Sequence, residues 1–250
     1  MADTKLKLDS LRQEIRLPLK SFAEKLKDGV GDNLQSITIV GSSLTDDFVP
    51  GSSDVNTVVV LRKHTTGAIK VLAAMVRQLR KSRLAAPLLM TENYIERSRD
   101  VFGIELLDLQ LLHETIYGKD PFSNLTIAKR DVRLQCEREL KATLIRLRQG
   151  FIASGANRKI VRDILASAAT GLVPLLRAML WLKDIERPQN ANAVFAQAAY
   201  EFSVSVDALA EARKWRRRWK SLREDELTAA FESIYAAVEQ LAEIVDGLKV

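Results

Sequence analysis

Two short apolar runs rich in β-branched residues, at positions 37–40 and 55–61, most limit how this chain can fold. β-Branched side chains favour strands, and short runs bounded by Gly, Ser and Asp are typical of strands. The segment between them, 41–54, contains two Gly-Ser pairs and three aspartates. The sequence therefore predicts two neighbouring strands joined by a polar loop that contains glycine.

The rest of the first half alternates helical patterns with short apolar stretches. Apolar residues at helical spacing predict helices over 8–30 and 67–83. Thr91 is well placed to cap a helical turn that follows it. The stretches at 87–90 and 101–109 are interpreted as a third and a fourth strand, and the residues from Gly118 to Pro121 have turn chemistry. The predicted class is α+β: a small mixed sheet with flanking helices.

The pattern changes at about residue 123, after which only long helical patterns follow. These patterns cover residues 125–152, 157–186, 190–213 and 223–248. Glycine or proline with asparagine separates the first three of them. The sequence thus predicts two domains, an α+β domain over 1–122 and an all-α helical bundle over 123–250.

The composition is that of a globular protein. With 250 residues, 47% of them hydrophobic and 28% charged, the chain can bury a core without covalent staples. The single cysteine, Cys136, excludes an internal disulfide and a cysteine-based zinc cluster, and its helical context predicts a core residue. Two isolated histidines, His64 and His113, do not have the spacing of zinc ligands. No signal peptide and no run of ~18 apolar residues is seen, so we expect a cytoplasmic protein with no membrane partner.

The net charge of +6 is concentrated in one place. The segment 213–220 reads Arg-Lys-Trp-Arg-Arg-Arg-Trp-Lys, which supplies six positive charges. One interpretation is a surface for nucleic acid or an acidic partner, where cations meet phosphates and rings meet bases. The favoured interpretation is that Trp215 and Trp219 anchor this segment to the bundle while the cations stay solvated. A third is that the patch steers an anionic substrate toward a cleft.

The polar loop and the start of the second run can form a site for phosphate and metal. In an extended strand alternate side chains share a face, so Asp54 and Asn56 project together. The backbone N–H groups of a Gly-Ser turn can cradle phosphate oxygens. Mg²⁺ prefers carboxylates together with substrate phosphates, and the expected fourth strand offers a third acid at Glu105 or Asp108.

These residues resemble the signature of the polymerase beta-like nucleotidyltransferases, a superfamily that includes minimal and aminoglycoside-type enzymes. The resemblance covers roughly residues 30–120. It implies that the turn binds the triphosphate of an NTP, and that acids hold Mg²⁺ while a nucleoside monophosphate passes to a hydroxyl of a small molecule or protein. The resemblance assigns nucleotide binding to Gly41, Ser42, Ser43 and Ser53, metal binding to Asp54, Asn56 and Glu105, and catalysis to Asp54 and Glu105.

Asn56 departs from the family pattern, which has a second aspartate at this position. An amide oxygen can ligate a metal, but it is neutral and does not bridge two cations as a carboxylate does. Two hypotheses remain open. Either another acid such as Asp46 or Asp47 substitutes and the chain is an active enzyme, or the chain is a catalytically degenerate nucleotide-binding or protein-interaction module. A homodimer is also open, and nucleic acid is a less favoured partner.

Overall fold

The computed structural model describes residues 5–215 and 222–250. The chain divides into two compact units. The first contains Met1–Arg99 and Leu106–Thr126, and the second contains Asp100–Glu105 and Ile127–Val250. The sequence predicts the domain boundary between residues 122 and 123. The contacts place the last boundary between residues 126 and 127, and they assign six earlier residues to the second unit.

The first unit is built on a four-stranded mixed sheet. Its strands are β1 (Leu34–Val40), β2 (Asn56–Leu61), β3 (Leu88–Met90) and β4 (His113–Gly118), in the order β3-β2-β1-β4. β1 pairs antiparallel with both β2 and β4, and β2 pairs parallel with β3. The predicted class, a small mixed sheet with flanking helices, is confirmed.

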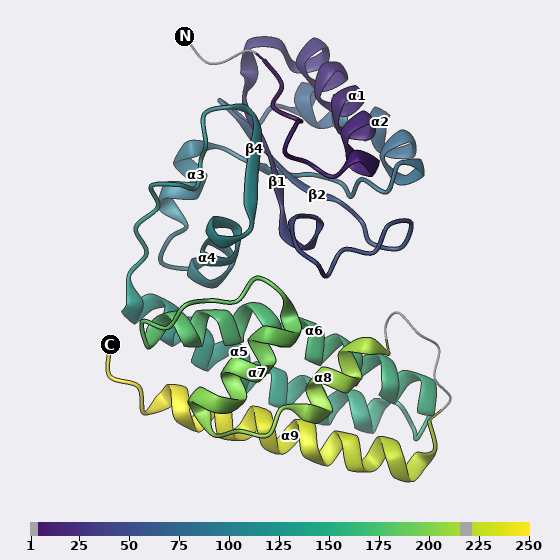
Figure 1. Ribbon diagram of the computed structural model, residues 1–250, viewed down its shortest axis with the longest axis vertical. Coiled ribbons are helices and arrows are strands. Elements are labelled where there is room, and N and C mark those ends of the chain that lie inside the picture. The colour runs from purple at the N-terminus through teal and green to yellow at the C-terminus, as the bar shows by residue number, and fades with distance from the viewer. Residues whose placement is uncertain (1–4, 216–221) are drawn as a thin grey trace. The chain divides into compact units, whose positions relative to one another are not determined.

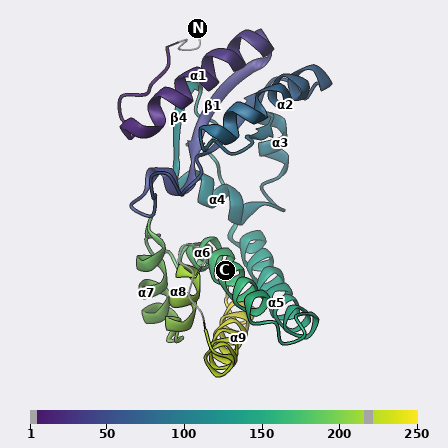
Figure 2. The same cartoon turned by 90° about the vertical axis from the view of Figure 1, so that its right-hand side faces the viewer.

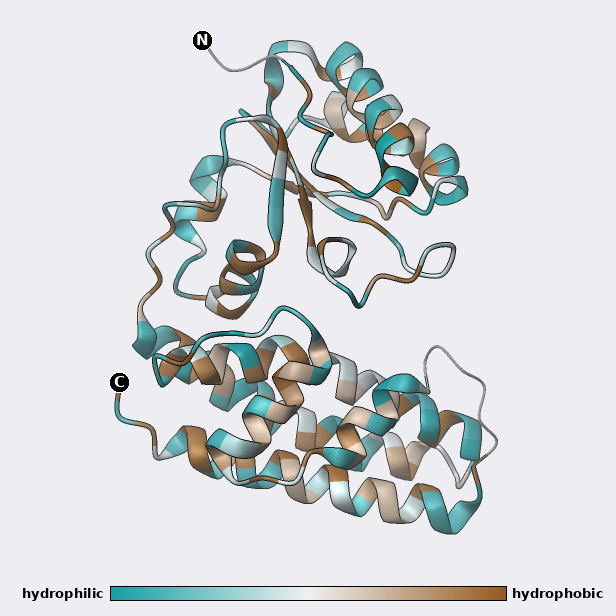
Figure 3. Ribbon diagram, viewed as in Figure 1, coloured by the Kyte–Doolittle hydropathy of each residue, from teal (hydrophilic) through white to brown (hydrophobic). Residues whose placement is uncertain are grey.

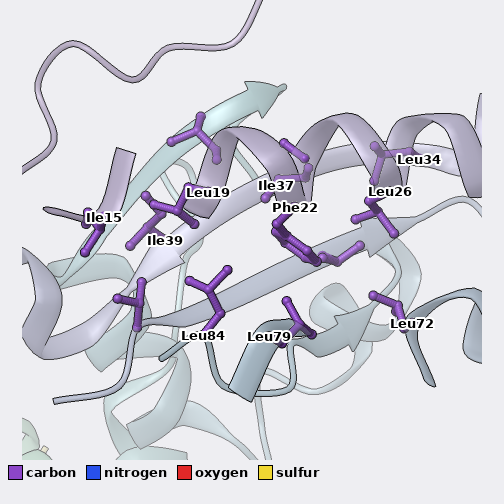
Figure 4. Packing of buried hydrophobic residues seen from close by; sticks show 14 of the residues in the cluster. Ile15, Leu19, Phe22, Leu26, Leu34, Ile37, Ile39, Leu72, Leu79 and Leu84 are labelled. Carbon is purple, nitrogen blue, oxygen red and sulfur yellow. The ribbon is translucent and has the colours of Figure 1, made fainter. Parts of the chain in front are cut away.

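Helices α1 (Gln13–Val30) and α2 (Thr66–Lys81) lie side by side against the sheet (Figures 1 and 2). Buried side chains of α1 such as Leu19, Phe22 and Leu26 pack with Ile37 and Ile39 of β1 (Figure 4). The alternate residues of β2, which face the other side of the sheet, are buried as well. Burial on both faces explains the continuous apolar run 58–61 of β2, whereas in β1 the buried Ser36 and Thr38 alternate with Ile37 and Ile39 (Figure 3).

The prediction of a strand over 101–109 is wrong. Residues 103–111 form helix α4 (Gly103–Leu111), which follows the short helix α3 (Glu92–Arg97) that Thr91 caps as predicted. The fourth strand, β4, comes after α4, at the segment interpreted as leading into a turn. The leucine-rich segment 104–112 contains good helix formers, whereas Thr115, Ile116 and Tyr117 are β-branched or aromatic and favour strands. Residue propensity therefore favours a helix for the first segment and a strand for the second.

The second unit is helical throughout its described part. It contains α5 (Lys129–Ala153), α6 (Arg158–Leu182), α7 (Ala191–Phe202), α8 (Asp207–Lys214) and α9 (Glu224–Asp246). Asn157 and Asn190 cap α6 and α7 with their side chains, where the sequence predicts breaks. Cys136 is fully buried on α5 as expected, and burial raises the pKa of its thiol to about 12.

Helix α6 is the core helix of this unit and contacts α5, α7, α8 and α9. It is also the one described helix long and apolar enough to cross a membrane by length and composition. Because 61% of its most apolar window is buried against the other helices, its hydrophobicity is that of a core element.

The basic segment falls at the edge of what the structure describes. Trp215, at the end of α8, is buried, in agreement with the prediction that it anchors the segment. Residues 216–220, which supply four of the six charges, lie outside the described residues.

Candidate functional site

The turn that follows β1 is fixed to both neighbouring strands. Gly41 opens a short 3-10 helix, η2 (Gly41–Leu44), and has a φ of 80°, which glycine adopts without strain. Its N–H donates to the carbonyl of Leu112, just before β4, at 2.9 Å. On the other side, Val40 pairs with Asn56 at the start of β2. The Gly-Ser turn therefore lies at one edge of the sheet, where β1 ends and β2 and β4 begin.

Ser43 places a buried hydroxyl in this turn. The residue is only 2% exposed, and its Oγ has no hydrogen-bond partner among residues 5–215 and 222–250. A buried hydroxyl without a partner is costly, so such groups in folded proteins usually have a water or ligand to bind. This supports the expectation that the turn can receive a polar ligand.

Asn56 lies beside the turn, and Asp54 shares its strand face. The amide nitrogen of Asn56 is 3.8 Å from the position that a Cβ on Gly41 would occupy. Val55, between the two polar residues, points into the core, so Asp54 and Asn56 share the opposite face as predicted. The Asp54 carboxylate is well exposed and lies 3.8 Å from the guanidinium of Arg83.

Ser53 has a structural contact within the loop. Its Oγ accepts a hydrogen bond from the N–H of Val49 at 3.0 Å, and its own N–H donates to the Val49 carbonyl at 2.8 Å. These bonds close the loop that leads into β2. The assignment of Ser53 to nucleotide binding stays a prediction. Its N–H is already used within the loop, so only its hydroxyl could donate a hydrogen bond to a phosphate.

Glu105 occupies a different setting from the one expected. It lies on α4 rather than on a strand, and its carboxylate accepts a hydrogen bond from the Gln135 amide at 2.7 Å. It belongs to the second unit, whereas Asp54 belongs to the first. Asp108 lies three residues after Glu105 on the same helix. Residues at this spacing share one face of a helix, whereas on the expected strand they would face opposite sides.

The acid that β4 itself carries does not replace Glu105. Glu114 pairs with Ile39, whose side chain is in the core under α1, so Glu114 is on the opposite face from Asn56. Its carboxylate accepts a hydrogen bond from Ser10. Within the described ranges, no group of three His, Cys, Asp or Glu side chains could hold a metal ion.

His113 is a polar residue at this edge that the sequence analysis considered only as a zinc ligand. It pairs with Val40 on the side of β1 away from β2, and therefore shares the face of Asn56, two strand spacings or roughly 10 Å away. Its Nδ1 is 3.0 Å from the Gln110 carbonyl and its Nε2 is 3.0 Å from the Asp120 carboxylate. Both ring nitrogens therefore have hydrogen-bond partners within the first unit. Because the sequence pattern predicts the fourth strand at 101–109, it does not identify His113 as a strand residue at this edge.

Acid is expected to weaken the first unit through Asp120. Burial alone would raise the pKa of this carboxyl, but hydrogen bonds from His113, Phe122 and Ser123 outweigh burial and lower the pKa below 3.8. A lowered folded-state pKa stabilises the fold above the unfolded pKa, and this stabilisation is lost as the pH falls through the folded value. Urea unfolding should show Asp120→Asn to be about 1–2 kcal/mol less stable than wild type at pH 7, with a smaller difference at pH 3.

The matched control for this comparison is Asp28→Asn, which removes an exposed carboxylate from α1 in the same unit. An Asp120→Asn deficit that stayed the same size from pH 7 to pH 3 would contradict the assignment.

A solved structure has a similar fold. The structure of spectinomycin adenyltransferase AAD(9) from Enterococcus faecialis with ATP and spectinomycin matches this chain with a TM-score of 0.54. The match covers 88% of this chain and 98% of that chain, at 11% sequence identity.

The chain has the nucleotidyltransferase fold. A nucleotidyltransferase-like protein from Exiguobacterium sibiricum 255-15 also matches, with a TM-score of 0.35 and 15% identity over 91% of this chain and 74% of that one, a likeness too distant to carry an argument. No family model and no curated protein matches the sequence.

Proposed function

We propose that this chain is a nucleotidyltransferase that binds an NTP at the turn after β1 and transfers its nucleoside monophosphate to a hydroxyl acceptor. One observation carries the proposal: the Gly41 backbone lies against the side chain of Asn56, on the face that Asp54 shares. The buried Ser43 hydroxyl in the same turn adds a donor. The fold, which this chain shares with an adenyltransferase, supports the same activity.

The residues fit one Mg²⁺ better than two. Asp54 offers a carboxylate and Asn56 a neutral amide oxygen, and Mg²⁺ is commonly held by one or two carboxylates with waters and substrate phosphates completing the shell. The assignment of Glu105 as a further ligand has no support from its contacts. When bound, the ion would neutralise phosphate charge as the leaving group departs.

The chain's own groups would orient the triphosphate. N–H groups of the turn and the hydroxyls of Ser42 and Ser43 are the proposed donors to phosphate oxygens. The acceptor oxygen bonds to the α-phosphorus, the bond between that phosphorus and the bridging oxygen breaks, and pyrophosphate leaves with the electron pair. The hydroxyl proton passes to water.

The proposed partners are the NTP and a small-molecule or protein acceptor. A small-molecule acceptor is supported by the Enterococcus faecialis structure, which contains spectinomycin with ATP. We propose a cytoplasmic location, and keep a homodimer and a nucleic-acid partner as secondary alternatives. The basic segment argues for neither, because most of its charge lies outside the described residues.

A second candidate function is nucleotide binding without transfer. Asn56 favours it, since the site then has one carboxylate where the family pattern has two at alternate positions. Losing one negative charge at a two-metal site costs several kcal/mol of cation affinity or transition-state stabilisation, or roughly a thousandfold in rate.

Isothermal titration calorimetry with ATP and the other NTPs, with and without Mg²⁺, tests the proposal. We expect saturable binding of at least one triphosphate that Mg²⁺ strengthens. Absence of binding at millimolar concentrations in both conditions would remove both candidate functions. Pyrophosphate release in the presence of an acceptor panel then separates transfer from binding alone.

Restoring the family aspartate is expected to strengthen metal binding. Asn56→Asp adds a second carboxylate on the face of Asp54, and should raise Mg²⁺ or Mn²⁺ affinity in the nucleotide complex by about tenfold or more. Competition titration with a metal-sensitive dye measures this effect, and Asn33→Asp, at the other end of β1, is the control. Unchanged metal affinity would count against the placement of Asn56 at the site.

A further inference from the structure

Arg83 is held next to Asp54 by the backbone. The N–H of Val55 donates to the Arg83 carbonyl at 2.8 Å, and the N–H of Ala85 donates to the Val55 carbonyl at 3.0 Å. Leu84 forms a parallel bridge with Val55 between these two bonds. Arg83 therefore lies on the β3 side of Asp54, while the Gly-Ser turn lies on its β1 side.

The conformation of Arg83 is unusual for its residue type. Its φ is 56°, in the left-handed region, which residues other than glycine and asparagine rarely adopt. A glycine or asparagine would fit this turn with less strain, so the arginine side chain is not explained by the turn itself. Backbone strain of this kind is often found where a side chain has a functional role.

The contact with Asp54 does not account for the arginine either. The Arg83 and Asp54 side chains are 57% and 60% exposed, and their charged atoms are 3.8 Å apart. An ion pair that is so exposed and so long contributes little to stability. The guanidinium is thus close to the candidate site, solvated, and able to turn toward another anion.

We propose that Arg83 binds the phosphates of the nucleotide and supplies the positive charge that a second metal ion would otherwise bring. This inference rests on the proposed function of the same site. Asn56 removes one negative charge that a second cation would need, and Arg83 adds one positive charge that does not depend on a metal. A guanidinium is suited to the role because its planar N–H groups match phosphate oxygens.

The strand order makes the arrangement feasible. From the turn after β1 to the segment before β3 is two strand spacings, about 10 Å, with Asp54 and Asn56 of the middle strand between them. A triphosphate held at the turn extends across that middle strand, and the long arginine side chain covers the remaining distance. In the absence of nucleotide, the Arg83 guanidinium lies near the Asp54 carboxylate instead.

The test is calorimetric titration of ATP in Mg²⁺ and in EDTA, for wild type and three variants. Arg83→Met should weaken ATP binding in EDTA tenfold to a hundredfold, while Arg83→Lys should lose less because it keeps the charge. Arg77→Met, which removes an exposed arginine from α2 in the same unit, should change affinity less than twofold. Thermal melts of each variant establish that it is folded.

Asp54→Asn provides a second readout, of the charge balance around Arg83. It releases Arg83 from its carboxylate partner, so ATP binding in EDTA should become severalfold tighter even as the effect of Mg²⁺ is lost. This variant also keeps the proposal testable if Arg83→Met does not fold.

The outcomes separate this inference from the proposed function. Wild type that binds ATP only with Mg²⁺, or Arg83→Met that binds ATP in EDTA as wild type does, overturns the role of Arg83 and leaves the nucleotide site in place. Wild type that binds no triphosphate in either condition overturns the proposed function.

Discussion

Asp54→Asn is expected to lower Mg²⁺-dependent nucleotidyl transfer by about a thousandfold or more. Asp54 is the carboxylate that shares the strand face of Asn56, whose side-chain amide lies near Gly41 of the turn. Its replacement leaves two neutral amides to hold the ion. A loss of several kcal/mol in cation binding corresponds to this factor, since each 1.36 kcal/mol is tenfold in rate. The rate of pyrophosphate release at saturating NTP measures it.

Glu24→Gln is the matched control, because it neutralises an exposed carboxylate on α1 that forms a long surface ion pair with Lys20. Its rate should stay within twofold of wild type. If Asp54→Asn keeps a tenth or more of the wild-type rate, another group must hold the metal. Asp46 and Asp47, in the loop before β2, are then the acids to replace next.

Gly118→Ala is expected to destabilise the first unit by about 2–5 kcal/mol. Gly118 ends β4 with a φ of 77°, and a Cβ there would be 1.9 Å from the carbonyl oxygen of Gln35 in β1. The strained φ contributes part of the loss. The remainder comes from forcing apart β1 and β4, the two strands that hold the turn after β1. Thermal unfolding measured by differential scanning calorimetry should show a fall in Tm of about 5–15 °C.

The matched control for this substitution is Gly51→Ala. Gly51 has a nearly identical φ of 76°, but apart from Gly51 and its two chain neighbours no described residue has an atom within 4 Å of the position its Cβ would take. Its cost should therefore be the backbone term alone, about 1–2 kcal/mol. Equal destabilisation by the two substitutions would contradict the predicted contact with Gln35. Hydrogen exchange of the β1 and β4 amides would localise the effect.

Strands whose partners are close in sequence were predictable. β1 and β2 are β-branched runs bounded by turn residues, so both strands could be predicted from local sequence, while their antiparallel pairing is a finding of the structure. The capped helix after Thr91 and the breaks at Asn157 and Asn190 also follow from local chemistry, because a side-chain cap acts within three residues of its position.

It was harder to predict which of the two segments, α4 or β4, is the fourth strand, because both are short and both contain apolar residues. A short apolar run does not distinguish a helix from a strand by periodicity alone. β4 is defined by its pairing with β1, a partner more than seventy residues earlier in the chain. Placing the strand too early made Glu105 look like a strand residue and left His113 without a role.

The sequence alone determined that a Gly-Ser turn, Asp54 and Asn56 share one edge of a sheet, because each relation depends on neighbouring residues and on strand periodicity. Only the tertiary structure decided that the Ser43 hydroxyl is buried, that Glu105 bonds to Gln135 and that Arg83 lies beside Asp54. These contacts join residues up to thirty positions apart, and they form only when the strands and helices pack. No local pattern encodes such pairs, because the partner of a side chain is set by the path of the whole chain.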